Sequence, residues 1–197
     1  MSLTASDLSA TRFPWTVRAD SLPRRAAIAL AASAFVALCA HISVPLPFTA
    51  VPLTLQPFAV IVVGLLLSPV DSFAALALYL IEGASGLPVF TPSGPGGLIQ
   101  LFGPSGGFLL SYPLVAAVAG MMLRLLSGLK NKFSAATIAG AAACTLLYIA
   151  GAAWFAMLLH ANPRTVWISA VAPFLPGEIV KILAAAGITT ALTSRRG

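Results

Sequence analysis

From Ala26 to Leu123 the chain contains no Lys or Arg, and the only acidic residues in this stretch are Asp71 and Glu82. A segment of this length with so few charges cannot provide the solvated surface of a water-soluble domain, where charged side chains are abundant. The whole chain is similar, since only 8% of its residues are charged, whereas soluble domains usually carry about 25%. The sequence therefore predicts an integral membrane protein.

Six apolar segments are candidates for membrane-spanning helices, each of which needs about 20 mostly apolar residues. They are Ala26–Val44, Leu53–Ser68, Val70–Ile81, Phe108–Leu126, Phe133–Leu159 and Thr165–Thr193. The second and third are short and are separated by Pro69, so they either form a tight helical hairpin or do not fully cross the bilayer. We expect an all-α fold with six transmembrane helices in residues 26–194 and a polar cytoplasmic arm in residues 1–25.

The positive charges predict the orientation of these helices. Six crossings place nine of the eleven Lys and Arg residues on one side of the membrane: Arg12, Arg18, Arg24, Arg25, Arg124, Lys130, Lys132, Arg195 and Arg196. Only Arg164 falls in an outer loop, and Lys181 lies within the last helix. Because short cytoplasmic loops are enriched in Lys and Arg, we expect both termini in the cytoplasm.

Two loops on the opposite side, residues 45–52 and 82–107, are rich in Pro and Gly and contain no Lys or Arg. Irregular backbone at membrane depth is tolerated only where it is buried in protein or lines a cavity. We therefore expect these outer loops to fold inward over a site. Ordinary external connectors are the alternative interpretation.

Glu178 and Lys181 form the most informative polar pair, because they lie three residues apart in a long uncharged segment. This spacing places them on one face of a helix. Ionisable residues inside a membrane normally face a cavity or each other. The pair either fixes the last helix to the bundle by mutual neutralisation or, in addition, binds a ligand, with Lys181 attracting an anion and Glu178 accepting N–H hydrogen bonds.

Thr54 and Gln56 follow Pro45, Pro47 and Pro52, which favour an extended backbone. If the extended geometry continues, alternation places the hydroxyl of Thr54 and the amide of Gln56 on the same side, where they can hydrogen-bond a polar ligand. Capping of the first turn of the following helix is an equal alternative for Gln56.

Gly96, Gly97 and Gln100 lie in the second loop, without the Lys that a Walker A phosphate loop requires. The glycines permit tight turns and a close approach of the backbone to a ligand or a neighbouring helix. The exposure of Gln100 stays open. Tyr79 and Tyr112 either line a site or belong to the aromatic belt at the membrane interface.

No pattern in the sequence indicates catalysis, a metal site or nucleotide binding. Cys39 and Cys144 lie about a hundred residues apart in apolar segments and are expected to be small core residues. We therefore expect no enzyme activity, no catalytic residues, no metal, no cofactor and no nucleic-acid partner. Any uphill transport then takes its energy from a partner protein or an ion gradient.

Ala27, Ala31 and Ala34 give the first helix a row of small side chains, which lets helix backbones approach closely in a membrane. The row either packs within the bundle or forms a docking face for another membrane subunit.

Four spaced blocks of the sequence resemble the BioY family, the biotin-binding S components of energy-coupling factor (ECF) transporters. The blocks are PLP…VPLTLQ at 45–56, LYL…GASGLPVF at 78–90, GG…LFGPSGGF at 96–108 and PGEIVK at 176–181. The resemblance implies a six-helix, multi-pass protein of the bacterial cytoplasmic (inner) membrane that captures biotin from outside. Residues 26–194 are then a substrate-binding domain. An S component for another vitamin and a membrane-embedded lipid-modifying enzyme are the alternatives.

The resemblance also implies roles for particular residues and partners. Glu178 and Lys181 occupy the family's acidic and lysine binding positions, although the acidic residue is more often Asp. Ala27 and Ala31 match the face that contacts a transmembrane T component, which works with two ATPase subunits; only these use ATP. The expected substrate-binding residues are Thr54, Gln56, Tyr79, Gly96, Gly97, Gln100, Glu178 and Lys181. Biotin is the transported ligand, and the sequence leaves a homo-oligomer open.

Overall fold

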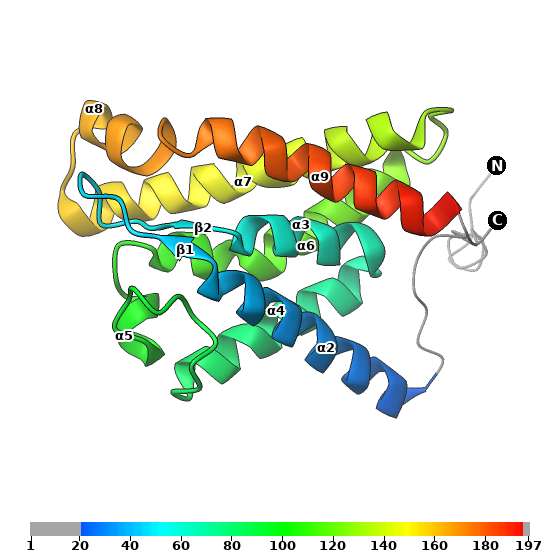
Figure 1. The fold of residues 1–197 in the computed structure, drawn as a ribbon, viewed down its shortest axis with the longest axis horizontal. Coiled ribbons are helices and arrows are strands. Elements are labelled where there is room, and N and C mark those ends of the chain that lie inside the picture. Colours follow the sequence, from blue (N-terminus) through cyan, green and yellow to red (C-terminus); the bar gives the residue numbers. More distant parts are fainter. Residues whose placement is uncertain (1–20, 195–197) are drawn as a thin grey trace, which may run out of the picture.

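The computed structural model describes residues 21–194, and helices account for most of them (Figure 1). Residues 1–20 of the expected arm, with Arg12 and Arg18, lie outside the described residues, as do Arg195 and Arg196. The elements are α2 (Leu22–His41), β1 (Ser43–Val44), β2 (Leu53–Thr54), α3 (Gln56–Leu66), α4 (Pro69–Ala84), α5 (Gly97–Leu101), α6 (Gly106–Leu125), α7 (Lys132–Leu159), α8 (Pro163–Val166), the π-helical turn η1 (Trp167–Val171) and α9 (Leu175–Ser194).

Within the described residues, α2, α6, α7 and α9 are long enough and apolar enough to cross a bilayer. The helix α3 has 11 residues, which at 1.5 Å per residue extend over about 17 Å, less than the roughly 30 Å hydrocarbon core. With 16 residues, α4 is also shorter than a typical span. The helices are therefore those of a multi-pass membrane protein, in which α3 and α4 form the short pair expected around Pro69.

The short helix α3 lies at the centre of the bundle, where α6, α7 and α9 cover it (Figure 1). Its residues from Ala59 to Leu65 are all buried, as expected for a helix that is apolar on every side. A Cβ atom at Gly64 would lie only 2.5 Å from the carbonyl oxygen of Ala116 on α6. Glycine thus allows α3 and α6 to pack backbone against backbone, as small residues do between membrane helices.

The bundle has two different ends (Figure 1). At one end, which we call the basic end, lie the start of α2, the α3–α4 and α6–α7 turns and the last turn of α9. Its Lys and Arg residues include Arg24, Arg25, Arg124, Lys130 and Lys132. At the other end, the loop end, lie residues 42–55, 85–105 and 160–174. Arg164 belongs to this end.

Three local features differ from the helices expected from sequence. The predicted last span, Thr165–Thr193, is interrupted after η1, and α9 begins at Leu175. Pro173 explains the break, because a proline has no N–H and its ring clashes with the carbonyl four residues earlier. A two-residue strand pair, with Ser43 opposite Thr54, departs from the all-α prediction. The Gly- and Pro-rich second loop contains the short helix α5.

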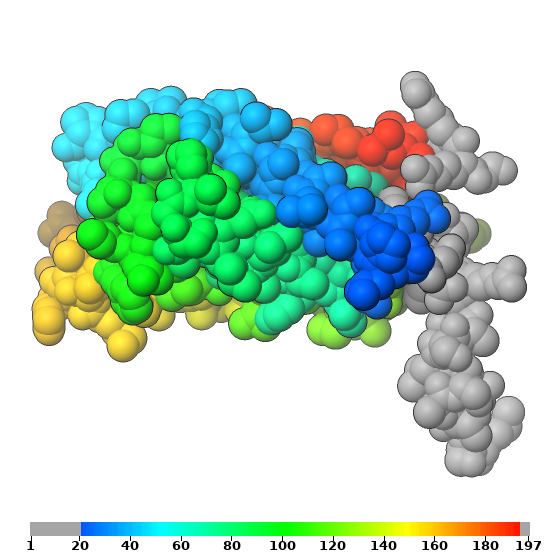
Figure 2. All heavy atoms as spheres, turned by 90° about the horizontal axis from the view of Figure 1, so that it is seen from below, coloured from blue at the N-terminus to red at the C-terminus, as the bar shows by residue number. Residues whose placement is uncertain are grey.

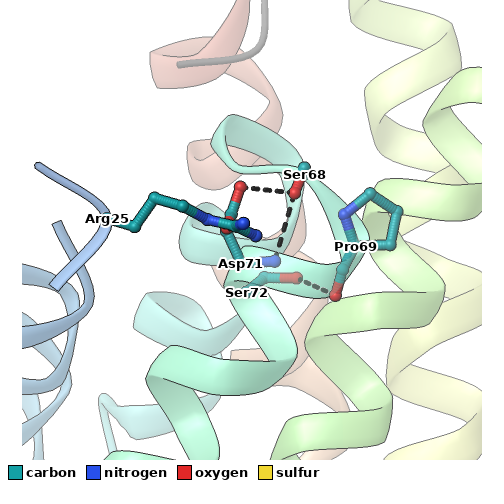
Figure 3. A network of polar contacts seen from close by, with 5 residues as sticks. All are labelled: Arg25, Ser68, Pro69, Asp71 and Ser72. Atoms are coloured by element: carbon teal, nitrogen blue, oxygen red, sulfur yellow. Dashed lines mark hydrogen bonds and ion pairs between the residues drawn. The ribbon is translucent and has the colours of Figure 1, made fainter. Parts of the chain in front are cut away.

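The first helix begins at Leu22 rather than at Ala26, with Pro23 in its first turn, where the fixed φ of proline suits a helix start. Arg25 therefore belongs to α2 and reaches Asp71 on α4, with distances from its Nε and Nη2 to Oδ1 of 2.8 and 2.6 Å (Figure 3). Asp71 lies in the first turn of α4, whose N-cap is Ser68. The backbone N–H of Asp71 donates to Ser68 Oγ, which donates in turn to Asp71 Oδ2.

One side of α2 lies on the surface beside α4, as Figure 2 shows in blue and green. Ala27, Ala31 and Ala34 are exposed on it, whereas Ser33 and Val36 face the core. The row of small residues therefore does not pack within the bundle. A docking role for Ala27 and Ala31 stays a prediction.

Candidate ligand-binding site

A cavity at the loop end is enclosed by α3, α6, α7, α9 and the two long loops. The centre of a water molecule can occupy about 50 Å³ of it, more than the 10–15 Å³ that one ordered water needs. The lining residues are Val51, Pro52, Thr54, Gln56, Pro57, Thr91, Gln100, Ser105, Phe108, Leu109, Tyr112, Leu147, Tyr148, Phe174 and Glu178. A mostly apolar wall with a few polar groups is typical of small-molecule sites.

Glu178 supplies the carboxylate of the cavity. Its Oε1 accepts a hydrogen bond from Lys181 Nζ at 2.6 Å, and its Oε2 faces Cys144 Sγ at 3.7 Å. The side chains of Lys181 and Glu178 are only 10% and 4% exposed. Glu178 lies in the first turn of α9, where the helix dipole favours a negative charge. The break at Pro173 therefore places this carboxylate at a helix start.

Lys181 lies one turn further along α9 and is not among the residues that line the cavity. Its ammonium group neutralises Glu178 from behind. Within the part of the chain that the structure describes, no Lys, Arg or His lines the cavity. A ligand in the cavity therefore meets one carboxylate together with neutral amide and hydroxyl groups.

Gln56 and Tyr79 are joined in a short chain of hydrogen bonds. Gln56 Nε2 donates to Tyr79 Oη at 2.6 Å, and Tyr79 Oη donates to the carbonyl oxygen of Val89 at 3.0 Å. Gln56 begins α3 without capping it through its side chain, and both Thr54 and Gln56 line the cavity. Tyr79 is fully buried behind them, so it orients the amide of Gln56 and fastens the second loop to α4.

Gln100 and the two glycines of the second loop occupy different positions. Gln100 is buried and lines the cavity, and its Oε1 accepts a hydrogen bond from the backbone N–H of Gly96 at 3.1 Å. Gly96 and Gly97 have φ angles of 72° and 59°, a left-handed region that favours glycine. Both line a neighbouring hollow on the loop end, which shares Thr91 with the cavity.

A side-chain hydrogen bond joins the first loop to η1. Thr49 Oγ1 donates to the carbonyl oxygen of Ser169 at 2.6 Å. Pro173 lies four residues after Ser169 and has no N–H, so it leaves this carbonyl without an α-helical donor. Residues of both loops, Val51 from the first and Gln100 from the second, thus form the wall of the cavity on its loop-end side.

Sequence reasoning missed several lining residues, among them Tyr148, Thr91, Ser105 and Phe174. Tyr148 follows Cys144 by one helical turn on α7, so both side chains lie on the face of α7 that is directed toward Glu178. That spacing was a usable signal. Tyr112, for which the sequence allowed either a site-lining or an interfacial role, also lines the cavity. Glu82, by contrast, is not a lining residue, and its carboxylate accepts a hydrogen bond from Ser33 on α2.

Comparison with known proteins gives consistent matches. A model of the BioY family matches residues 10–197. The probable biotin transporter BioY of Pyrococcus horikoshii is 34% identical over 134 residues, which cover 66% of this chain and 74% of that protein. The biotin transporter BioY of Thermotoga maritima is 33% identical over 160 residues, or 81% and 90% of the two chains. BioY2 of Lactococcus lactis is 33% identical over 156 residues, or 79% and 82%.

A solved structure shares the fold. It is the crystal structure of the S-component for biotin from an ECF-type ABC transporter, with a TM-score of 0.80 and 23% identity. The match covers 91% of this chain and 95% of that chain, so the S-component architecture expected from sequence is confirmed. Because the family model extends over nearly the whole sequence, the chain belongs to the BioY family, as its four sequence blocks predicted.

Proposed function

We propose that this chain captures biotin as the S component of an ECF transporter and takes part in its uptake across the bacterial cytoplasmic membrane. Membership of a family whose relatives are named biotin transporters or probable biotin transporters supports the ligand. The observation that carries the proposal is the buried carboxylate of Glu178, which lines a mostly apolar cavity and is neutralised by Lys181 from outside it.

The chemistry of the cavity suits biotin in one orientation. The ureido ring of biotin has two N–H donors, its thiolane ring is apolar and its valerate tail is anionic. Glu178 accepts N–H hydrogen bonds, whereas it repels a second carboxylate. The ureido ring therefore lies at Glu178, and the tail points toward the loops, where Gln100 and Ser105 offer neutral donors.

In the membrane, the basic end faces the cytoplasm and the loop end faces outward. The chain passes between the two ends six times, twice through the short helices α3 and α4. The concentration of Arg24, Arg25, Lys130 and Lys132 at one end supports this orientation. In this arrangement the loops receive biotin from outside. Reporter fusions at the two termini should both show cytoplasmic activity, and activity on opposite sides would contradict six crossings.

The partners follow from the same proposal. The exposed face of α2 at Ala27 and Ala31 contacts a transmembrane T component, and two ATPase subunits supply the energy. Replacing both alanines by Leu should reduce co-purification of the T component while biotin binding is retained, because this face lies away from the cavity. Unchanged co-purification would show that the T component contacts another surface of the protein.

Two alternative functions have less support. A lipid-modifying enzyme is disfavoured because the relatives are transporters. An S component for another vitamin would need a cavity that accepts a different head group. The test is equilibrium binding of labelled biotin to the purified chain, with unlabelled biotin, thiamine and riboflavin as competitors. Saturable binding displaced only by biotin is expected, and absence of binding or stronger displacement by another vitamin would overturn the proposal.

A further inference from the structure

A groove lies on the side of the bundle, between α7 on one wall and η1 with the start of α9 on the other. The centre of a water molecule can occupy about 540 Å³ of this groove. Its lining residues are Ala141, Cys144, Thr145, Tyr148, Ile149, Ala152, Trp167, Val171, Leu175, Glu178, Ile179 and Ile182. Tyr148 and Glu178 line both this groove and the ligand cavity, so the groove runs along the back of the wall that carries Glu178.

The surroundings of the groove are hydrocarbon rather than water. Its walls belong to α7 and α9, both apolar and long enough to cross a bilayer, and they lie side by side (Figure 1). Ile149, Trp167 and Ile179 on its rim are exposed by 63%, 54% and 60%. Since a bilayer surrounds these residues, its lipids are the molecules that reach the groove.

The length of the groove matches one acyl chain. Along α7 it extends from Ala141 to Ala152, and the eleven steps between these residues rise about 17 Å at 1.5 Å each. Half of the roughly 30 Å hydrocarbon core is about 15 Å. The groove is therefore about as long as one leaflet is thick. On α7 it occupies the middle of the helix, and its opposite wall, η1 and the first two turns of α9, lies next to the loop end.

A cation marks the headgroup end. Arg164 on α8 is exposed and precedes Trp167 by three residues in a continuous helical stretch, so the two lie on one face, one turn apart. A guanidinium group binds phosphate in a bidentate geometry, and Trp is enriched at the level of the headgroups. In contrast, the described residues that line the groove include no Lys or Arg.

We propose that this groove is a binding site for one anionic phospholipid of the outer leaflet. One acyl chain lies between α7 and α9, and the phosphate lies at Arg164. The bound chain covers the part of the wall formed by Glu178 and Cys144. This site does not depend on which ligand occupies the cavity, so its test needs no biotin.

Native mass spectrometry of the full chain tests the site directly. The purified protein is incubated with dioleoyl phosphatidylglycerol or dioleoyl phosphatidylcholine, and the retained lipids are counted. We expect one phosphatidylglycerol molecule, retained at least fivefold more than phosphatidylcholine. Arg164→Gln, an exposed change that leaves the fold intact, should remove the preference between the two lipids.

Two bulky substitutions on α7 provide matched variants. Ala152→Phe fills the groove and should abolish lipid retention, whereas Ala153→Phe, on the exposed face outside it, should not. Ile149→Trp, on the rim, gives a second filling variant if Ala152→Phe fails to fold. Equal retention of the two lipids, unchanged retention in the filled variants, or a lipid-free dimer in which a second copy occupies the groove would each overturn the proposal.

Discussion

Two ion pairs of the same length lie in opposite surroundings. The distance from Arg25 Nη2 to Asp71 Oδ1 at the basic end and the distance from Lys181 Nζ to Glu178 Oε1 at the cavity are both 2.6 Å. The side chains of the first pair are 47% and 19% exposed, and those of the second are 10% and 4% exposed. Equal distances therefore do not imply equal energetic roles.

The two ion pairs differ in their exposure to water, and this difference determines how much each contributes to stability. An exposed pair contributes only about 0–1 kcal/mol, and the Arg25 pair, supported by Ser68, serves to join α2 to α4 (Figure 3). Burying a pair costs the hydration free energy of both charges, and the attraction between them offsets this cost only in part. A protein with hydrophobic residues in place of the pair is therefore often as stable. Glu178 and Lys181 lie one turn apart on the same helix, so their ion pair does not connect two separate elements of the fold. We infer that this second pair is retained for the ligand.

The largest effect is expected from Lys181→Ala. This change leaves the buried carboxylate of Glu178 without its partner, which costs about 3–5 kcal/mol in comparable cases. Thermal unfolding in detergent should show the loss, and biotin affinity should fall at least tenfold, about 1.4 kcal/mol. Lys132→Ala, at an exposed lysine, is the control and should change neither. Unchanged affinity in the first variant would remove Lys181 from any role in binding.

Glu178→Gln is expected to act mainly on binding. A hydrogen bond to a charged group contributes about 1.5–3 kcal/mol, so affinity for biotin should fall roughly ten- to a hundredfold. Glu82→Gln is the matched control, because Glu82 is a half-buried carboxylate near the end of α4 that accepts a hydrogen bond from Ser33 but does not line the cavity. Equal losses in the two variants, measured by equilibrium binding, would show that the effect is not local to the cavity.

A smaller effect is expected from Tyr79→Phe, which removes the hydroxyl between Gln56 and the carbonyl oxygen of Val89. One neutral hydrogen bond contributes about 1 kcal/mol, or roughly fivefold in affinity. Combining the change with Gln56→Leu gives a double-mutant cycle in biotin binding. Strict additivity of the two changes would contradict the proposed orientation of Gln56 by Tyr79.

The smallest effect is expected from Arg25→Gln at the exposed pair. Stability should fall by less than about 1 kcal/mol, and the difference from the unmodified chain should shrink as salt is raised. Biotin affinity should stay the same. A weaker affinity would mean that the contact between α2 and α4 is coupled to the cavity, and the contrast between the two ion pairs would fail.

Sequence patterns predicted the features that depend on local spacing and composition. The i,i+3 spacing of Glu178 and Lys181 and their isolation among apolar residues predicted a paired acid and base, and the structure has this pair. Pro and Gly content predicted irregular loops, and residues of both loops line the cavity. The short central helix α3 also agrees with the short apolar segment after Pro52.

Other features depend on tertiary contacts that local patterns do not encode. Lys181 was expected to touch the ligand, yet only Glu178 of the two lines the cavity, because the axial rotation of α9 decides which side chain faces inward. The interruption at Pro173 was missed because the surrounding residues are continuously apolar. Gly96 and Gly97 were grouped with Gln100 by sequence, but their turn directs them to a neighbouring hollow.

The most direct test of the role of the buried pair replaces both partners together. Glu178→Gln combined with Lys181→Met removes both charges at similar side-chain volume, so no uncompensated charge stays buried. We expect thermal stability close to that of the unmodified chain, with biotin affinity at least tenfold weaker in equilibrium binding. A double variant that binds biotin as tightly as the unmodified chain would show that the pair serves the fold and not the ligand.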